Sequence, residues 1–348
     1  MKALVTGGSG FIGSHLIEKL LNDGHYVVSL DLFGASSENI KRFLPRGSFR
    51  SVYVDISASD ACERIFRLLN AYQIDFIFHL AGLADIVPSI NDPLKYFKTN
   101  VLGTLSVLEA ARKAGIYKFV YASSSSVYGI PDPEDIPTSE TAPIKPQYPY
   151  AETKYQGERW VSHYNQVYHL PTISLRLFNV YGPISMTTVT YGAVFGTFLA
   201  QKINGKPFTV VGDGKQSRDF VFVTDVCDAF IKAAKARFSG EVFNVGSGKP
   251  ETILQLAELL GGEITHLPKR PGEPDITHAN ISKITKMLDW LPVVSFETGI
   301  KIMLDNIDFW KDAPVWTPET IKEATKDWFE FLAKSHKKGD TDVANTGK

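Results

Sequence analysis

The glycine-rich stretch near the start of the chain constrains the fold more than any other feature. A short apolar run, residues 2–6, leads into Gly7-Gly8-Ser9-Gly10-Phe11-Ile12-Gly13, and a pattern with helical periodicity comes next, over residues 14–20. Glycines let the backbone turn tightly and approach a pyrophosphate, and the helix after them offers free N–H groups at its positive end. The stretch therefore predicts a dinucleotide-binding turn between a strand and a helix.

An acidic residue stands at the distance that such a site requires. Asp31 closes the second apolar run, residues 26–30. At this position a carboxylate accepts hydrogen bonds from the adenosine ribose and repels a 2′-phosphate. The sequence therefore favours NAD over NADP.

The composition is that of an ordinary globular protein. Of the 348 residues, 44% are hydrophobic and 22% are charged, and the formal net charge is −1. This charge gives no support for binding to nucleic acid or to an anionic membrane, and no apolar run reaches the roughly 18 residues that span a bilayer. Cys62 and Cys227 lack metal-ligand spacing. We expect a cytoplasmic protein without a metal, a nucleic-acid partner or a membrane contact, and a disordered tail over residues 333–348.

Strand-like and helical patterns alternate along the first half of the chain. Such alternation predicts an α/β fold, a Rossmann-type doubly wound parallel sheet, whose ligands bind at the carboxyl ends of the strands. The expected strands are 2–6, 26–30, 51–54, 76–82, 118–124 and 172–177, and the expected helices are 60–72, 93–114 and 150–168.

A change of composition at Asn179 predicts a second, smaller domain. We expect a Rossmann domain of residues 1–178 plus about 216–248, and a mixed α/β substrate domain of about 179–215 plus 249–332. The elements expected beyond Asn179 are a helix at 194–204, a hairpin-like unit at 208–214, a strand at 220–223, a helix at 226–237, a strand at 242–245 and helices at 254–260, 281–288 and 296–310.

Tyr150 and Lys154 stand four residues apart at the start of a predicted helix, so both side chains project from one face. A lysine ammonium beside a tyrosine hydroxyl lowers the pKa of the phenol, which makes a phenolate available as a base near neutral pH. The strand at 118–124 delivers a serine cluster to the same edge of the sheet. These residues predict an acid–base site beside the dinucleotide.

The chain resembles the extended short-chain dehydrogenase/reductase superfamily, and within it the nucleotide-sugar epimerases of the UDP-glucose 4-epimerase-like group. The resemblance covers residues 1 to about 310. Its carriers, in order, are Gly7-x-x-Gly10-x-x-Gly13, Asp31, Asp55-Ile56, His79-Leu80-Ala81-Gly82, Asn100, the run 123–129, Tyr150-Ala151-Glu152-Thr153-Lys154, the run 176–183 and the run 212–220.

The resemblance implies roles for individual residues. Tyr150 would be the base, Lys154 its electrostatic partner and a ribose ligand, and Ser124 the hydroxyl that orients the substrate proton. The residues that would bind NAD are Gly7, Gly10, Phe11, Ile12, Gly13, Asp31, Asp55, Ile56, Leu80, Ala81, Gly82, Asn100, Tyr150 and Lys154. Those that would bind the nucleotide sugar, with UDP as the expected nucleotide, are Ser124, Ser125, Asn179, Arg218, Arg270 and Thr277.

Three of the motif residues also have a plain structural interpretation. Arg218 could form a surface ion pair with Asp219, and Asn100 could be hydrogen-bonded in the core behind the site. His79 is interpreted as a satisfied histidine at the end of a strand rather than as a catalyst.

The resemblance leaves the reaction to be chosen. Members of the group begin by oxidising the sugar at C4, and the next chemical step depends on further acids and bases. The 4,6-dehydratases carry Asp-Glu where this chain has Ser125 and Ser126, and the decarboxylases carry a glutamate at the position of Ser126. This comparison favours 4-epimerisation through a transient 4-keto intermediate. A dehydratase or decarboxylase is the alternative, and a non-catalytic NAD-binding sensor is less favoured because the catalytic residues are retained.

The identity of the substrate sugar and the oligomeric state are also indicated only by the resemblance. Ala84 replaces a lysine found in many UDP-galactose 4-epimerases, a small residue at Thr277 would admit an N-acetyl group, and hydroxyls in the loop 184–191 could hold a uronate. A UDP-hexose, UDP-N-acetylhexosamine or UDP-uronic acid therefore all remain open. A homodimer is expected through the helices at 93–114 and 150–168.

Overall fold

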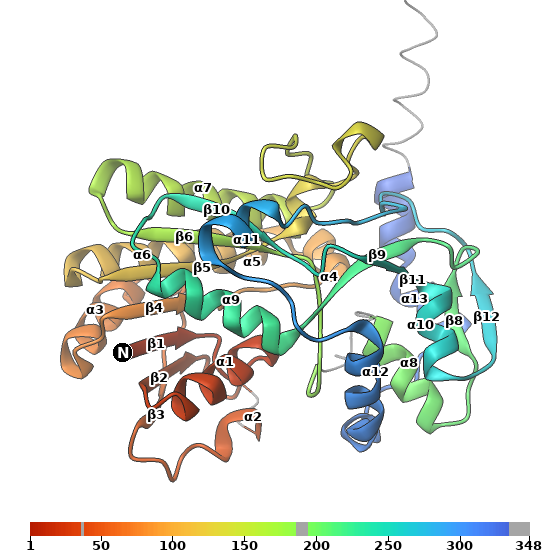
Figure 1. The fold of residues 1–348 in the computed structure, drawn as a ribbon, viewed down its shortest axis with the longest axis horizontal. Coiled ribbons are helices and arrows are strands. Elements are labelled where there is room, and N and C mark those ends of the chain that lie inside the picture. The colour runs from red at the N-terminus through yellow and green to blue at the C-terminus, as the bar shows by residue number, and fades with distance from the viewer. Residues whose placement is uncertain (36–37, 186–193, 334–348) are drawn as a thin grey trace, which may run out of the picture.

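The computed structural model describes residues 1–35, 38–185 and 194–333 (Figure 1). Most of the polar loop expected near the sugar, and the tail from residue 334 onward, lie outside the described residues. The expectations for these two segments therefore stay predictions.

The larger part of the molecule is built on one parallel sheet, as the sequence predicts. The strand order is β10-β6-β5-β4-β1-β2-β3, and every neighbouring pair is parallel. The strands are β1 (Lys2–Thr6), β2 (Tyr26–Asp31), β3 (Phe49–Tyr53), β4 (Phe76–His79), β5 (Lys118–Ser124), β6 (Thr172–Leu177) and β10 (Glu241–Val245).

Helices cover both faces of this sheet because alternate strand residues point to opposite sides. Ala3 and Val5 of β1 belong to the core on one face, whereas Leu4 belongs to the core on the other. The first face is covered by α1 (Phe11–Asn22) and α9 (Val223–Lys235), and the second by α3 (Ala61–Tyr72), α6 (Gly103–Ala114) and α7 (Pro149–Tyr168).

The second lobe lies to the right in Figure 1 and holds two small sheets. Its core includes a cluster of aromatic rings in which Tyr181 stacks on Phe195 and Phe220 stacks on Phe296. The sheets are β11 (Pro250–Thr252), β9 (Ser217–Phe222) and β7 (Asn179–Tyr181), and β12 (Ile264–Leu267) with β8 (Phe208–Val211). The helices of this part are α8 (Val194–Ile203), α10 (Ile253–Leu260), α12 (Phe296–Asp305) and α13 (Pro318–Ala324).

Shorter elements connect these parts. They are α2 (Glu38–Lys41), α4 (Ile86–Asn91), α5 (Pro93–Phe97) and α11 (Ser282–Leu288), a π-helical turn (Lys98–Leu102), and 3₁₀ turns at Ser125–Tyr128, Pro133–Asp135 and Ile307–Trp310.

Two sequence predictions need correction. The unit at 208–214 is not a hairpin, because β8 pairs in parallel with β12, more than 50 residues later in the chain. The long helix at 93–114 is interrupted by the π-helical turn at Lys98–Leu102. Such turns redirect single side chains, and this one carries Asn100 into the core.

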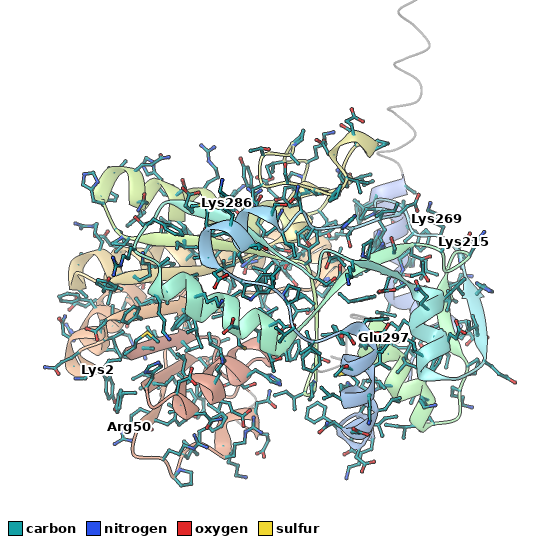
Figure 2. The ribbon with its side chains drawn as sticks, in the orientation of Figure 1. Lys2, Arg50, Lys215, Lys269, Lys286 and Glu297 are labelled. Carbon is teal, nitrogen blue, oxygen red and sulfur yellow. The ribbon has the colours of Figure 1, made fainter. Side chains whose placement is uncertain are left out.

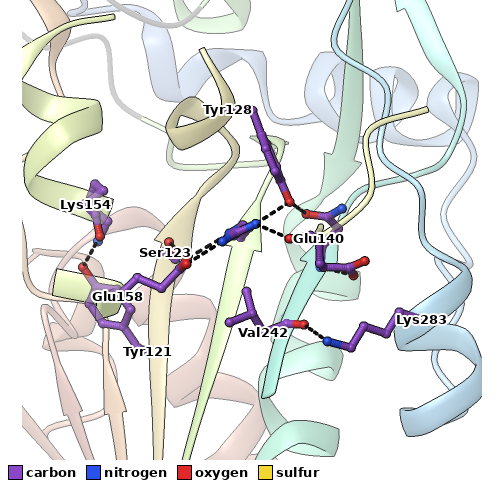
Figure 3. Close-up of polar contacts among 10 residues, drawn as sticks. Tyr121, Ser123, Tyr128, Glu140, Lys154, Glu158, Val242 and Lys283 are labelled. Carbon is purple, nitrogen blue, oxygen red and sulfur yellow. Dashed lines mark hydrogen bonds and ion pairs between the residues drawn. The ribbon is translucent and has the colours of Figure 1, made fainter. Parts of the chain in front are cut away.

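A buried ion pair connects α7 with the central strands. Arg176 of β6 and Glu158 of α7 lie 2.6 Å apart, and their side chains are only 6% and 5% exposed. Ser123 of β5 donates to Glu158 over 2.6 Å, and Arg176 donates to the Tyr128 hydroxyl over 2.8 Å (Figure 3). Tyr128 in turn donates to Asn244 of β10 over 2.7 Å. The network fixes the helix that carries Tyr150 to three strands of the sheet.

Other charged side chains lie on the outer surface of the molecule. Figure 2 shows Arg50, Lys215 and Lys269 at the periphery of the molecule.

Among the helices of the described residues, none is both long enough and apolar enough to cross a membrane. The same residues contain no cluster of histidine, cysteine and acidic side chains suited to a metal ion.

Glu158→Ala should lower the free energy of unfolding by about 3–5 kcal/mol, because it leaves the Arg176 charge buried without its partner. Denaturant unfolding of both proteins measures the difference. Glu109→Ala is the matched control, since Glu109 pairs with Arg112 on the surface of α6, where an exposed ion pair contributes little. Equal losses in the two variants would contradict the assigned role of the buried pair.

Candidate active site

A cavity of about 1010 Å³ opens at the carboxyl ends of β1, β2 and β4. This is the edge at which a doubly wound sheet binds its ligands. The lining includes eleven of the residues expected to bind NAD: Gly7, Gly10, Phe11, Ile12, Gly13, Asp31, Asp55, Ile56, Leu80, Ala81 and Gly82.

The glycine loop has the close packing that a pyrophosphate site needs. Gly10 is the N-cap of α1, and Gly7 has a φ of +70°, which favours glycine. A Cβ atom on Gly13 would lie 2.2 Å from the Gly7 carbonyl oxygen, and one on Gly7 would lie 2.8 Å from the Ala81 nitrogen. Larger residues would therefore displace the backbone at the positive end of α1.

Asp31 is held at the end of β2 by three hydrogen bonds. Its Oδ2 atom accepts from the Ser9 amide over 2.8 Å, from the Ser9 hydroxyl over 2.9 Å and from the Ser29 hydroxyl over 3.0 Å. Burial raises the pKa of Asp31, and these hydrogen bonds oppose the rise. Asp55 is fixed differently, because its Oδ1 atom accepts from the backbone and hydroxyl of Ser57.

These features fit NAD. The close-packed glycines leave room for a pyrophosphate, the Asp31 carboxylate suits ribose hydroxyls, and the cavity has the size of a large ligand. The fit to NAD therefore depends on the backbone of the glycine loop as much as on the Asp31 side chain.

A second cavity of about 500 Å³ shares Ala84 with the first. It collects side chains from β5, α7, β7 and β9 and from the loop before α11. All of the residues expected to bind the sugar nucleotide line it, together with the candidate base: Ser124, Ser125, Tyr150, Asn179, Arg218, Arg270 and Thr277.

Tyr150 lies in the first turn of α7 beside the serine cluster. Burial raises the pKa of Tyr150, and hydrogen bonds with Ser124 and Ser126 oppose the rise. Ser126 also donates to the Ser124 hydroxyl over 2.8 Å. The sequence-based expectation of a lowered phenol pKa is therefore wrong for this structure, because desolvation is the larger effect. The ring of Tyr148 lies parallel to that of Tyr150, with centroids 6.3 Å apart.

Lys154 is buried behind the two cavities rather than lining them. Desolvation lowers its pKa to about 7, against an opposing attraction from Glu158. Its ammonium lies 4.4 Å from the centroid of the Tyr121 ring, a cation–π distance. A Cβ atom on Gly82 would lie 4.0 Å from Lys154 Nζ, so the charge sits next to the floor of the larger cavity.

Asn100, like Tyr150 and Lys154, is an expected NAD ligand that does not line the larger cavity. Its side-chain oxygen accepts from the Leu83 amide over 2.8 Å, and its nitrogen donates to the Leu83 carbonyl and to the Thr153 hydroxyl. These bonds give it the core position that the sequence left open as an alternative. His79 is confirmed as a satisfied histidine between Thr6 and Thr104, and burial lowers its pKa to about 3.

Two arginines of the second cavity share one carboxylate. Glu273 lies 3.6 Å from Arg218 and 3.1 Å from Arg270. The suggested pairing of Arg218 with Asp219 does not occur, because Asp219 is buried and accepts from Ser247, Gly248 and Ala279.

Thr277 forms hydrogen bonds with two neighbouring strands, β7 and β9, beside this cavity. Its hydroxyl donates to Asn179 over 3.2 Å and accepts from the Asp219 amide over 3.1 Å. Thr277 therefore fixes Asn179 relative to the strand that carries Arg218.

The lining of the second cavity includes four polar or aromatic residues that the sequence analysis did not predict as site residues: Asp85, Tyr148, Glu273 and Trp328. Tyr148 and Glu273 lie within two or three residues of predicted site residues, so proximity was an available signal. Trp328 donates to the Pro271 carbonyl over 2.7 Å and carries Arg270 over its ring at 5.4 Å. It lies beyond the segment covered by the family resemblance, which gave no signal for it.

Comparisons with known proteins agree with this geometry. A UDP-glucose 4-epimerase of Mycolicibacterium smegmatis is 36% identical over 308 residues, which cover 86% of this chain and 96% of that protein. UDP-glucuronic acid decarboxylase 1 of Xenopus tropicalis is 32% identical over 311 residues, covering 86% of this chain and 70% of that protein.

A solved structure is similar over nearly its whole length. It is the UDP-glucuronic acid 4-epimerase of Bacillus cereus in complex with UDP-glucuronic acid and NAD, with a TM-score of 0.79 and 33% identity. The match covers 88% of this chain and 99% of that one. Residues 3–246 also match the model of the NAD dependent epimerase/dehydratase family. Since this match spans more than half of the sequence, the chain belongs to the NAD-dependent epimerase/dehydratase family.

Proposed function

We propose that this protein is an NAD-dependent 4-epimerase of a UDP-sugar, acting through a transient 4-keto intermediate. The observation that carries the proposal is a single cavity that holds Tyr150 and Ser124 together with Arg218 and Arg270, and that adjoins the larger cavity at Ala84. An acid–base pair and a diphosphate clamp thus lie beside the site that fits NAD. Relatives that act on UDP-sugars support UDP as the nucleotide.

The residues of the chain supply the proton chemistry. Bound NAD would supply the acceptor for the hydride from C4 and its donor on the return. Tyr150 takes the proton of the C4 hydroxyl, and Ser124 holds that hydroxyl in line through its own hydrogen bond. Lys154, four residues later on the same face of α7, would stabilise the phenolate through the charge of its protonated form. The same groups return the proton after the sugar has turned.

The diphosphate would bind between the two arginines. Their planar guanidinium groups can each hold two phosphate oxygens. Glu273 lies between them in this structure, so binding requires the carboxylate to give up part of its contact with Arg218 or Arg270. Asn179 and Thr277, which lie beside the strand that carries Arg218, would also contact the nucleotide.

The dehydratase and decarboxylase alternatives need acids at two positions where this chain has Ser125 and Ser126. Both reactions require a carboxylate where Ser125 or Ser126 stands, and a serine hydroxyl does not exchange protons near neutral pH. Ser126 is also engaged, since its amide and hydroxyl both donate to Ser124. A non-catalytic sensor is less favoured, because the structure holds Tyr150 in hydrogen-bond contact with Ser124.

Domain organisation and location complete the proposal. We propose the division given by the sequence, with residues 1–178 plus about 216–248 binding NAD and about 179–215 plus 249–332 binding the nucleotide sugar. We also propose a cytoplasmic location, since both cysteines of the chain are free thiols, as in a reducing compartment.

We further propose a homodimer through the outer faces of α6 and α7. These helices pack side by side, and Leu102, just before α6, and Trp160 of α7 are 43% and 38% exposed. Leu108 and Val161 of the same two helices are buried within the protomer. The proposed interface is therefore smaller than the apolar content of the two helices suggests.

Tyr150→Phe should reduce turnover of the UDP-sugar by about a hundredfold to ten-thousandfold, since it removes the acid–base group and little else. NAD binding, measured by calorimetry, should remain near that of the wild type. Tyr168→Phe, at the exposed end of the same helix, is the control and should keep full activity. A Tyr150→Phe enzyme with nearly full turnover would show that another group is the base.

Lys154→Met should stabilise the NAD-free protein most below pH 7. The pKa of Lys154 is lowered to about 7 in the folded protein from an ordinary value of 10.5, so the folded state binds the proton less tightly. The free energy of unfolding of the wild type therefore rises with pH between these two values, whereas that of the variant has no contribution from Lys154 that depends on pH. Thermal unfolding at about pH 6 and about pH 9 should show the advantage of the variant shrinking with pH. A constant difference would contradict the lowered pKa.

Leu102→Asp combined with Trp160→Asp should convert the dimer to a monomer, because two charges would be buried in the proposed interface. Sedimentation of the wild type and the variant measures the change. Val293→Asp, at a residue that is 83% exposed in the loop before α12, is the control. A monomeric wild type, or a variant that stays dimeric, would exclude this interface.

A further inference from the structure

Asp85 places a carboxylate in the candidate sugar cavity. It comes after Ala84 beyond the carboxyl end of β4 and directly precedes α4, which lies between the sheet and the second lobe (Figure 1). The cavity that it lines also holds Tyr150 and Ser124. The carboxylate is close enough to these groups that its charge raises the pKa of Tyr150. Asp85 therefore faces the space in which the sugar would react.

The fold itself makes no use of this carboxylate. Asp85 occupies the N-cap of α4, a position at which aspartate ordinarily accepts a backbone hydrogen bond, yet its side chain accepts none from the helix. Across residues 1–35, 38–185 and 194–333, no hydrogen bond or ion pair engages the side chain. Burial raises the pKa of Asp85, and no charge among the described residues opposes this rise. A half-buried carboxylate without a donor costs free energy that a ligand could recover.

Two arginines and Glu273 give one part of the cavity a net positive charge, whereas the Asp85 carboxylate makes another part negative. Arg218 and Arg270 also line a neighbouring cavity of about 330 Å³ that Asp85 does not reach. On the other side, Ala84 next to Asp85 lines the NAD cavity. A ligand that fills the space between them must be anionic near the arginines and must offer hydrogen-bond donors near Asp85. A nucleoside diphosphate joined to a neutral sugar has this distribution.

We propose that Asp85 is a specificity-determining residue that accepts hydrogen bonds from hydroxyls of a neutral sugar and disfavours a uronic acid. The inference rests on the proposed function, because it assumes that the sugar lies beside Tyr150. Two carboxylates that share a partly buried site repel each other, so a uronate would bind Asp85 poorly. Of the three sugar classes that the sequence leaves open, the inference retains UDP-hexose and UDP-N-acetylhexosamine.

Asp85→Asn tests this inference because it removes the charge and keeps the shape. Calorimetry would give the dissociation constants of UDP-glucose and UDP-glucuronic acid for the NAD-loaded wild type and variant. We expect the wild type to bind UDP-glucose more tightly, and the preference to fall by about tenfold or more in Asp85→Asn. Thermal unfolding of the variant should occur at the same temperature as that of the wild type or a higher one, because the substitution removes a partly desolvated charge that has no partner among the described residues.

Asp60→Asn is the matched control, because Asp60 is also an N-cap residue whose side chain makes no cap hydrogen bond, on the exposed start of α3. It should leave the preference unchanged. An unchanged preference in Asp85→Asn, or a wild type that prefers UDP-glucuronic acid, would overturn the inference.

Turnover of the same two sugars separates this inference from the proposed function. If binding preference shifts but C4 is never inverted, the proposed epimerase activity is wrong and Asp85 still selects the ligand. If C4 is inverted but the preference does not shift, the activity holds and Asp85 is not the selector. If neither nucleotide sugar binds, both proposals are wrong.

Discussion

The buried pair of Glu158 and Arg176 is the interaction on which the arrangement of the active site depends. Glu158 lies one helical turn after Lys154 and two turns after Tyr150, so whatever fixes Glu158 also fixes the catalytic face of α7. Ser123, which donates to Glu158, immediately precedes Ser124. The pair thus holds Tyr150 and Ser124, the proposed base and its serine partner, in a fixed relative position. Because both charges are buried, any shift of α7 along the sheet would leave one of them without a partner.

The same network also connects the catalytic helix to a strand from much later in the chain. The Tyr128 hydroxyl accepts a hydrogen bond from Arg176 and donates one to Asn244 of β10. Asn244 in turn donates to the Thr138 carbonyl. The strand β10 is reached only after the chain has left the main sheet and built β8 and β9. From Thr138 the network continues into the second lobe, because the Thr138 amide donates to the His278 carbonyl and the Asn280 amide donates to the Thr138 carbonyl.

Local patterns predicted the main sheet and the NAD cavity well, whereas features set by distant contacts were missed. The glycine loop and Asp31 depend on residues close in sequence, and both occupy the cavity as expected. The parallel pairing of β8 with β12 depends on segments more than 50 residues apart, and no periodicity within either segment indicates it. The pKa of Tyr150 shows the same limit, because spacing indicates a nearby lysine but not the desolvation that opposes it.

The choice of sugar is the property least visible in the motifs, and the structure shows why. The motifs that identify the family reach Gly82 and resume with the run that starts at Ser123, with Asn100 alone between them. Asp85 lies just outside the first of these motifs, on a short helix whose position is set by packing against α7. A substitution there leaves the chemistry of Tyr150 in place while changing which sugar can lie against it. Specificity can therefore change in this fold without any change in the catalytic motifs.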